Sequence, residues 1–265
     1  MQGDRIDWSS PWLAPLAPWR ARAEVADWPL ALSQCARSQG LVNAAGRPIE
    51  FVAADDAAGA PYEAHIFATG RVPSRANRHD LFNALIWLAY PRAKAALNGR
   101  QAAVIAREGI GAQRGPVRDA ATLIDESGIM LATDDDDVLV ALARHDWQWL
   151  FVRERQRWGG RIAVRVFGHA LLERLSTPFK AITAAVIPVA HPGATEELDR
   201  AAADFIEHAD LAPRRLPHLP VLGIPGWWPE NEAPSFYLDR TVFRPPRDGG
   251  SGADHSARSR RTANH

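Results

Sequence analysis

The segment RHDLFNALIWLAYPRAK, residues 78–94, constrains the fold more than any other part of the chain. At about 100° per residue, its leucine, phenylalanine and alanine side chains fall on one side of a predicted helix and need a core to bury them. Pro91 predicts a kink, after which the helix continues through residues 92–109. The opposite side of the helix carries hydrogen-bonding side chains: His79, Asp80, Asn83, Trp87, Tyr90 and Lys94.

This polar side has three interpretations. It can line a site, form a buried hydrogen-bond network under a neighbouring segment, or face water. A solvated helix face usually carries Lys, Glu and Arg, whereas this one is rich in His, Asp, Asn, Trp and Tyr, which suit fixed hydrogen bonds. The composition therefore favours the first two interpretations, and the sequence leaves the choice between them open.

Strand-like and helix-like segments alternate along the second half of the chain. Alternation and β-branched content predict a strand at 161–167, and the apolar run at 182–189 predicts a strand buried on both faces. Helices are predicted at 168–179 and at 195–211, the second with Thr195 as its N-cap. The alternation indicates an α/β or α+β fold, a single mostly globular domain with several helices around a small sheet.

Other segments extend this prediction. Residues 28–41 have the apolar spacing of a helix, and residues 49–70 alternate like one or two short strands joined by a turn. Residues 117–133 predict a short helix or strand, a turn at DESG and a strand. Residues 134–158 predict one long or two abutting helices, whose leading aspartates suit a helix N-terminus.

Both ends of the chain have unusual compositions. Residues 1–30 interleave four tryptophans with prolines, which predicts an extended segment clamped to the domain by buried rings. Residues 216–246 contain seven prolines and predict an irregular lining or covering loop. Residues 247–265 lack apolar anchors, so we expect one domain over residues 1–246 and a disordered tail after it.

Composition and missing motifs exclude several classes of protein. The chain has 31 basic and 31 acidic residues, so its zero net charge gives no electrostatic case for nucleic acid. The N-terminus does not resemble a signal peptide, and no apolar run reaches the roughly 20 residues of a membrane helix. Cys35 is the only cysteine, which excludes an intramolecular disulfide. We therefore expect a soluble, cytoplasmic protein without the glycine loops of nucleotide enzymes or the nucleophile elbow of α/β-hydrolases.

Three later clusters carry hydrogen-bonding or charged residues. His169 and Glu173 are four residues apart on a predicted helix, a spacing that can hold a metal ion but more often makes a simple hydrogen bond. Arg118 and Asp119 are adjacent, shortly before the acidic pair of the DESG turn. Glycines and prolines fix the backbone around Trp227, whose ring can stack on a planar ligand or, more commonly, fill a core.

Four segments resemble the bacterial family known as Domain of Unknown Function 3025: RHDLFNALIWLAYPRAKAALN, RGPVRDAATLIDESG, GHALLERLSTPF and LPVLGIPGWWPENE. The resemblance extends from about Ile6 to Arg247 and implies no particular activity, ligand or fold. Tyr90 stands where the family leads us to expect phenylalanine, which speaks against a functional role for its hydroxyl. The family pattern falls on His79, Asp80, Asn83, Trp87, Pro91, Lys94, Arg118, Asp119, Asp125, Glu126 and His169.

These residues predict an enzyme of hydrolase type acting on a small molecule. Its expected catalytic groups are His79, Asp80, Asn83, His169 and Glu173. Four of them are candidate ligands of a divalent metal ion: His79, Asp80, His169 and Glu173. Arg118 is expected to hold an anionic substrate, with further substrate contacts from Lys94, Asp119, Trp87 and Trp227. The alternative is a non-catalytic protein that binds a ligand or partner, in which these residues form a structural network.

Overall fold

A four-stranded sheet forms from the segments with the strongest strand patterns. Its strands, in spatial order, are β4 (Ile162–Val166), β3 (Gly128–Thr133), β5 (Thr183–Ala190) and β6 (His218–Pro220). β3 and β5 run parallel, whereas the two outer pairs are antiparallel. Every residue of β3 is buried and the middle of β5 is buried too, as expected of the two central strands.

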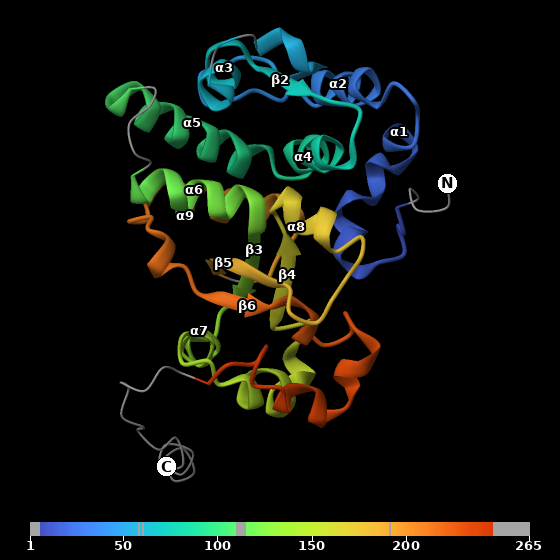
Figure 1. The fold of residues 1–265 in the computed structure, drawn as a ribbon, viewed down its shortest axis with the longest axis vertical. Coiled ribbons are helices and arrows are strands. Elements are labelled where there is room, and N and C mark those ends of the chain that lie inside the picture. The colour runs from blue at the N-terminus through green and yellow to red at the C-terminus, as the bar shows by residue number, and fades with distance from the viewer. Residues whose placement is uncertain (1–5, 58, 60, 110–114, 191, 246–265) are drawn as a thin grey trace, which may run out of the picture.

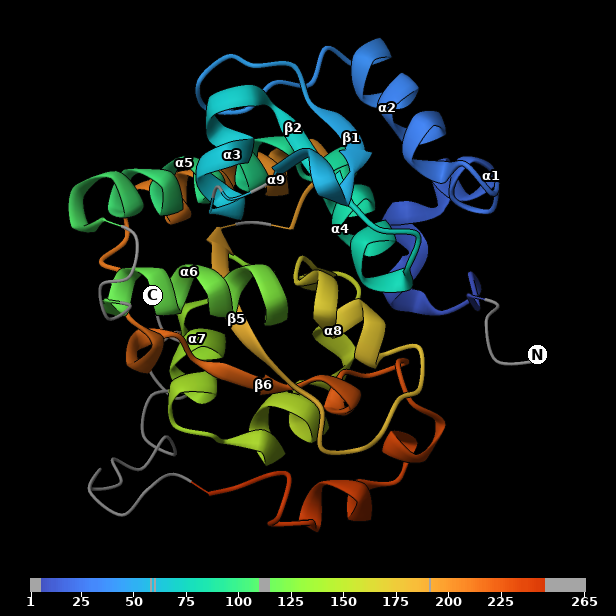
Figure 2. The same cartoon turned by 45° about the horizontal axis from the view of Figure 1, so that its top comes forward.

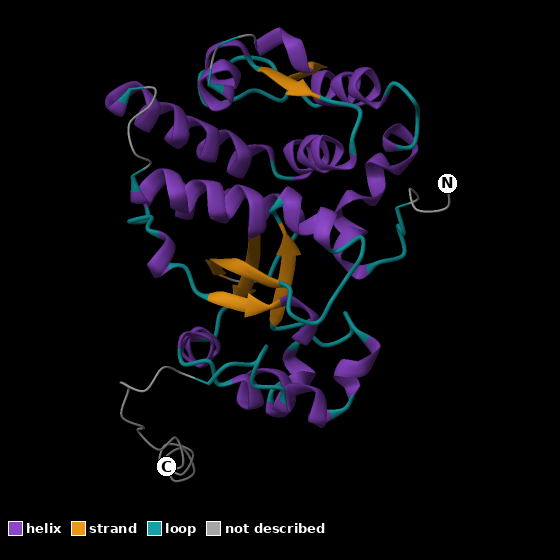
Figure 3. Cartoon of the chain, viewed as in Figure 1, coloured by secondary structure: helices purple, strands orange, loops and turns teal. Residues whose placement is uncertain are grey.

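The computed structural model describes residues 6–57, 59, 61–109, 115–190 and 192–245. Helices predominate over two small sheets in these residues, which is an α+β fold (Figure 3). The disorder predicted for residues 247–265 concerns a segment outside the described residues. In the part of the chain described, no helix is both long and apolar enough to cross a bilayer.

Three helices lie directly against the sheet. They are α6 (Pro116–Ser127), α8 (His169–Arg174) and α9 (Thr195–His208) (Figure 1). The hydrophobic core extends from the strands into this layer, and all three helices contribute buried residues to it.

α4 (Arg78–Ala89) and α5 (Pro91–Glu108) form that next layer. α4 packs against α8, and α5 packs against α6 and α9. Every residue of α4 from Asp80 to Ala89 is buried, polar ones included. The interpretation of its polar side as a solvated face is therefore wrong.

An outer layer covers α4 and α5 on the side away from the sheet (Figure 2). It consists of α2 (Trp28–Ser38), α3 (Tyr62–Thr69) and the parallel pair β1 (Glu50–Ala53) and β2 (Arg71–Ser74). α2 contacts α4, and α3 contacts α5. This layer closes over the polar side of α4, which is why that side can be buried.

The remaining elements are short. They include α1 (Arg20–Ala23), α7 (Asp136–Ala143), a π-helix at Trp149–Arg153, and 3-10 helices at Pro11–Trp19, Ala54–Ala57, Arg155–Arg157, Pro213–Arg215, Val221–Gly223, Pro229–Glu232 and Pro234–Leu238.

The side chain of Asp135 accepts a hydrogen bond from the backbone N of Asp137 at 3.0 Å, so the aspartates do cap α7 as predicted.

The kink predicted at Pro91 is a complete break between two helices. Tyr90 leaves the helical conformation (φ −134°, ψ 61°), and Pro91 begins α5. The carboxylate of Asp199 on α9 accepts hydrogen bonds from the backbone N of Arg92 at 3.0 Å and of Ala93 at 2.8 Å. Asp199 therefore supplies from another helix the cap that α5 lacks in its own sequence.

Two of our local predictions are wrong about chain conformation. The second half of residues 49–70 is α3 rather than a strand, because Pro61 starts a helix that Gly70 ends in the left-handed region (φ 77°). Residues 116–127 form one helix that passes directly into β3, so Asp125 and Glu126 lie in the last turn of α6 and not in a loop.

Two further predictions need correction at the ends of elements. Much of the proline-rich N-terminal segment coils into a 3-10 helix with Trp12 buried, so it is anchored by aromatic rings but not extended. The N-cap of α9 is Ala194 and not Thr195, because the carboxylate of Glu197 reaches back to the backbone N of Ala194 at 2.9 Å.

Asp199→Ala should lower the free energy of unfolding by about 1–3 kcal/mol, since it leaves the buried backbone N–H of Ala93 and the part-buried one of Arg92 without this acceptor. Asp199→Asn keeps an acceptor oxygen and should lose less. Urea unfolding followed by circular dichroism measures both. Equal losses in the two variants would contradict the capping role.

Candidate functional site

A cavity of about 440 Å³ lies where the outer layer meets α4, α6 and α8. The outer layer lines it with Ala54, Tyr62, Glu63, Pro73 and Arg75, and the helices line it with His79, Asp80, Asn83, Asp125, Glu126 and His169. Four α-helices (α3, α4, α6 and α8), the 3-10 helix that begins at Ala54, and β2 thus bring together side chains that are far apart in the sequence.

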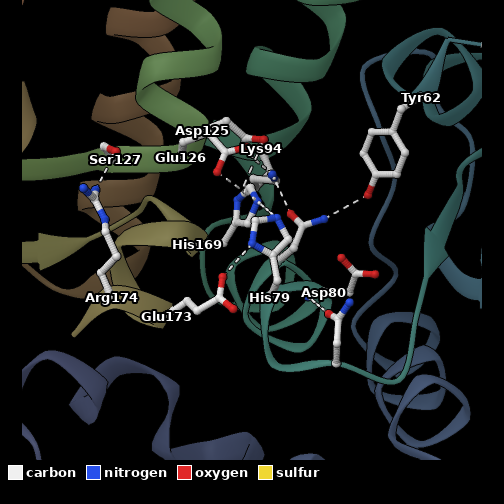
Figure 4. Close-up of polar contacts among 12 residues, drawn as sticks. Tyr62, His79, Asp80, Lys94, Asp125, Glu126, Ser127, His169, Glu173 and Arg174 are labelled. Carbon is white, nitrogen blue, oxygen red and sulfur yellow. Dashed lines mark hydrogen bonds and ion pairs between the residues drawn. The ribbon is translucent and has the colours of Figure 1, made fainter. Parts of the chain in front are cut away.

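Two histidine rings meet at the wall of this cavity (Figure 4). Nε2 of His79 lies 3.0 Å from Nε2 of His169, the first residue of α8. Nδ1 of His79 lies 2.9 Å from Oε2 of Glu173, which is one turn further along α8. With its Nδ1 hydrogen directed to Glu173, a neutral His79 presents the lone pair of Nε2 toward His169.

Glu126 lies beside the histidine pair because α6 and α8 approach closely. Its Oε2 is 3.7 Å from Nε2 of His169. Gly168 permits the approach: a Cβ at this position would lie 2.5 Å from the backbone N of Ser127 and 2.6 Å from the carbonyl of Glu126. Any side chain at Gly168 would push the end of α6 away from the start of α8.

His79, Glu126 and His169 form a set that can hold one metal ion. Each offers one donor atom, and these atoms all lie within 4.8 Å of one another. Two ring nitrogens 3.0 Å apart can both lie about 2.1 Å from a single ion, the usual Zn–N distance. Imidazole and carboxylate donors suit zinc and several other divalent metals, so the residues present fit a metal centre.

The protein keeps the imidazole of His169 neutral, which is the form that binds metal ions. Burial lowers its pKa to about 4; Lys94 and His79 act in the same direction, against the opposing effect of Asp125. Nδ1 of His169 is buried without a hydrogen-bond partner in the described chain, and Oδ2 of Asp125 lies 3.9 Å from it. At neutral pH the ring is therefore uncharged and can donate a lone pair.

A buried ion pair lies behind the histidines. Nζ of Lys94 is 2.5 Å from Oδ1 of Asp125 and 2.9 Å from Oδ1 of Asn83, and it lies 5.5 Å from the ring centroid of Trp87. Asn83 donates in turn to the hydroxyl of Tyr62 at 3.0 Å. Burial acts to raise the pKa of Asp125, but Lys94 and the two histidines outweigh it and leave that pKa below its ordinary value.

Glu63, in the first turn of α3, is a second unusual carboxyl of the cavity. Its Oε2 and its backbone carbonyl accept hydrogen bonds from Nδ2 of Asn98 at 2.7 and 2.9 Å. Burial and the charge of Asp125 raise the pKa of Glu63 to about 7, against the effect of Lys94. A carboxyl that titrates near neutrality is able to accept and return a proton.

Asp80 lines the cavity but its oxygens are engaged. They accept hydrogen bonds from the backbone N of Arg75 at 2.7 Å, from its Nε at 2.9 Å and from its Nη2 at 3.3 Å. The backbone N of Asp80 donates to the N-cap side chain of Asn77 at 2.7 Å. Asp80 therefore fixes Arg75 at the start of α4 and lies outside the histidine set.

Several residues predicted for the site lie elsewhere. Arg118 is half-buried and Asp119 exposed near the start of α6, and neither is among the described residues that line the cavity. The ring of Trp227 packs on Trp12 with centroids 5.8 Å apart, so it anchors the N-terminal segment. The hydroxyl of Tyr90 is buried and has no hydrogen-bond partner among the residues described.

The sequence prediction missed Tyr62, Glu63 and Arg75. All three belong to the outer layer, in or just after the segment that we expected to form strands. The one available signal was the helix start after Pro61, which places Tyr62 and Glu63 in a first turn. Nothing in the local sequence indicates that this turn covers α4.

Comparison with known proteins gives one match. The family described as "Protein of unknown function (DUF3025)" matches residues 49–247, a range that contains every residue lining the cavity. No curated protein and no solved structure matches the chain.

Lys94→Met should lower the free energy of unfolding by about 3–5 kcal/mol, because it leaves the buried carboxylate of Asp125 without a countercharge. The double variant Lys94→Met with Asp125→Leu removes both charges and should be more stable than Lys94→Met alone. A double-mutant cycle by urea unfolding measures the coupling. Purely additive losses would show that the two side chains do not interact.

Glu63 should make stability fall as pH rises. Its pKa is about 7 in the folded protein against an ordinary value of 4.5, so the folded state holds the proton more tightly. The stabilisation is complete below the ordinary value and is lost as pH rises toward about 7. Urea unfolding between pH 5 and pH 8 should therefore show a downward slope in the wild type that is reduced in Glu63→Gln. Parallel curves would contradict the raised pKa.

Proposed function

The chain belongs to the DUF3025 family of proteins of unknown function, and we propose that it is a hydrolytic enzyme whose divalent metal ion is held by His79, Glu126 and His169. One observation carries the proposal: two Nε2 atoms lie 3.0 Å apart at the wall of a cavity, with a carboxylate oxygen nearby. Two ring nitrogens facing each other share at most one hydrogen, whereas a metal ion engages both lone pairs.

Glu173 supports this proposal through its contact with His79. Metal-binding histidines usually donate their other ring hydrogen to a carboxylate or carbonyl, which fixes the tautomer and the ring orientation. The 2.9 Å contact between Nδ1 of His79 and Oε2 of Glu173 is such a pair. In this proposal Glu173 orients a ligand and Asp80 holds Arg75, so neither binds the ion directly.

The arrangement suits hydrolysis. A divalent ion held by His79, Glu126 and His169 would bind a water and lower the pKa of that water toward about 7. Glu63 lines the same cavity and would accept the proton of that water as the water oxygen bonds to the carbonyl carbon or phosphorus of the substrate. Glu63 would then return the proton to the leaving group, whose bond to the substrate breaks.

The second candidate is a non-catalytic protein that binds a ligand or partner. The observation that favours it is the extent of the buried network, since Asn83, Lys94 and Asp125 link α4, α5 and α6 directly. This network stabilises the fold whether or not an ion is bound. The two candidates differ in whether a bound ion supports turnover.

Purified protein titrated with Zn²⁺ or Mn²⁺ in a calorimeter should bind about one equivalent. His79→Ala and His169→Ala should lose this binding, because each removes a ligand. Asp80→Asn is the matched control within the cavity and should keep it. Unchanged binding in both histidine variants, with their folding checked by circular dichroism, contradicts the metal centre.

The same proteins test hydrolysis on a panel of p-nitrophenyl esters, phosphate monoesters and phosphate diesters. Turnover should require the ion, stop on chelation, and fall at least a hundredfold in Glu63→Gln although that variant still binds metal. Turnover that survives in His169→Ala contradicts the proposal. Metal binding without turnover on any compound of the panel favours the second candidate.

A further inference from the structure

Arg75 lies at the edge of the cavity in an arrangement that the proposed reaction does not use. It follows β2 and lines the cavity together with His79 and Glu126. Its side chain is 67% exposed, so the guanidinium is accessible from solvent. Arg118, which the sequence suggested as the anion-binding residue, has no such position.

One edge of the Arg75 guanidinium is fixed by Asp80. Nε donates to Oδ2 at 2.9 Å and Nη2 donates to Oδ1 at 3.3 Å, while the backbone N of Arg75 donates to the same carboxylate at 2.7 Å. Asp80 is 8% exposed and is itself held at the N-terminus of α4. Among the contacts found for Arg75 in the described chain, none involves Nη1. Because Asp80 fixes the guanidinium, Nη1 is a hydrogen-bond donor with a set orientation that remains for a ligand.

Tyr62 offers a second donor on the same side of the cavity. Its hydroxyl oxygen accepts a hydrogen bond from Nδ2 of Asn83 at 3.0 Å, which leaves the hydroxyl hydrogen free to donate. Burial raises the pKa of Tyr62 well above its ordinary value, and so does the charge of Glu63. The hydrogen therefore stays on the oxygen at neutral pH.

The charges of the cavity determine when an anion can enter. Glu63, Asp80, Asp125 and Glu126 line it, and the only Lys or Arg among the described lining residues is Arg75, with Lys94 paired behind Asp125. Carboxylates thus outnumber Lys and Arg side chains here, so we expect the metal-free cavity to disfavour an anion. A divalent ion at the histidine pair supplies the missing positive charge.

We propose that the cavity binds an oxyanion group of its substrate, a carboxylate or a phosphate, between the metal ion and the Nη1 edge of Arg75, with the Tyr62 hydroxyl as an additional donor. This inference rests on the proposed metal centre and specifies the substrate class that the centre acts on. Arginine suits this role because its planar fork matches the oxygens of carboxylate and phosphate groups.

The test is calorimetric titration of metal-loaded protein, freed of excess metal, with inorganic phosphate and separately with acetate. Metal-loaded wild type should bind at least one of the two anions, and metal-free wild type should bind neither. Which anion binds more tightly distinguishes a phosphate from a carboxylate substrate.

Arg75→Gln combined with Asp80→Asn should weaken anion binding about tenfold or more, as expected for the loss of a hydrogen bond to a charged group. The double variant is used because Arg75→Gln alone leaves the buried Asp80 carboxylate without its partner. Tyr62→Phe should weaken binding about threefold. Arg118→Gln is the matched control and should bind the anion like the wild type.

Metal uptake by every variant is measured first, which separates the two proposals. If the double variant takes up metal and binds the anion as tightly as the wild type, the role of Arg75 is overturned and the metal centre stands. If metal-loaded wild type binds neither anion, the anion site is also overturned and the metal centre stands. If the wild type takes up no metal, the metal centre fails and the anion site fails with it.

Discussion

The ion pair between Lys94 and Asp125 is the contact on which the rest of the site depends. It joins α5 to α6 in the interior, and Asn83 adds α4 to the same group. A buried charge without its partner is costly, so these three helices cannot separate without losing stability. The second carboxylate oxygen of Asp125 lies 3.9 Å from His169, which connects this scaffold to the histidine pair.

Two backbone features hold the side chains around the ion pair and the histidine pair in place. The break at Tyr90 and Pro91 turns α5 so that Lys94 meets Asn83 on the preceding helix. The absence of a side chain at Gly168 lets the start of α8 lie against the end of α6, which places His169 beside Glu126. Neither feature carries chemistry itself; the break sets the contact of Lys94 with Asn83, and Gly168 sets the approach of His169 to Glu126.

Much of the inner part of the molecule follows from local patterns. The helical spacing of residues 78–94 places His79 and Asn83 on one side, and the i, i+4 spacing brings His169 and Glu173 to one face. The outer layer was harder to predict, because a short apolar segment such as 49–70 alternates well enough to resemble strands and is helical in its second half. Glu63 lies in that helical half and Arg75 follows β2, and no local pattern indicates that either side chain lines a cavity with α4.

Local sequence patterns are enough to predict α2, α4, α5, α9, the central strands and the residue types on the polar side of α4, since these depend on spacing and side-chain chemistry along a single segment. Which of those residues meet depends on how the helices and layers pack against one another. The approach of His79 to His169 and Glu126, the pairing of Lys94 with Asp125, and the capture of Arg75 by Asp80 join different helices or the ends of different elements. Such distances depend on how layers pack, and packing is a property of the whole core that no local pattern contains.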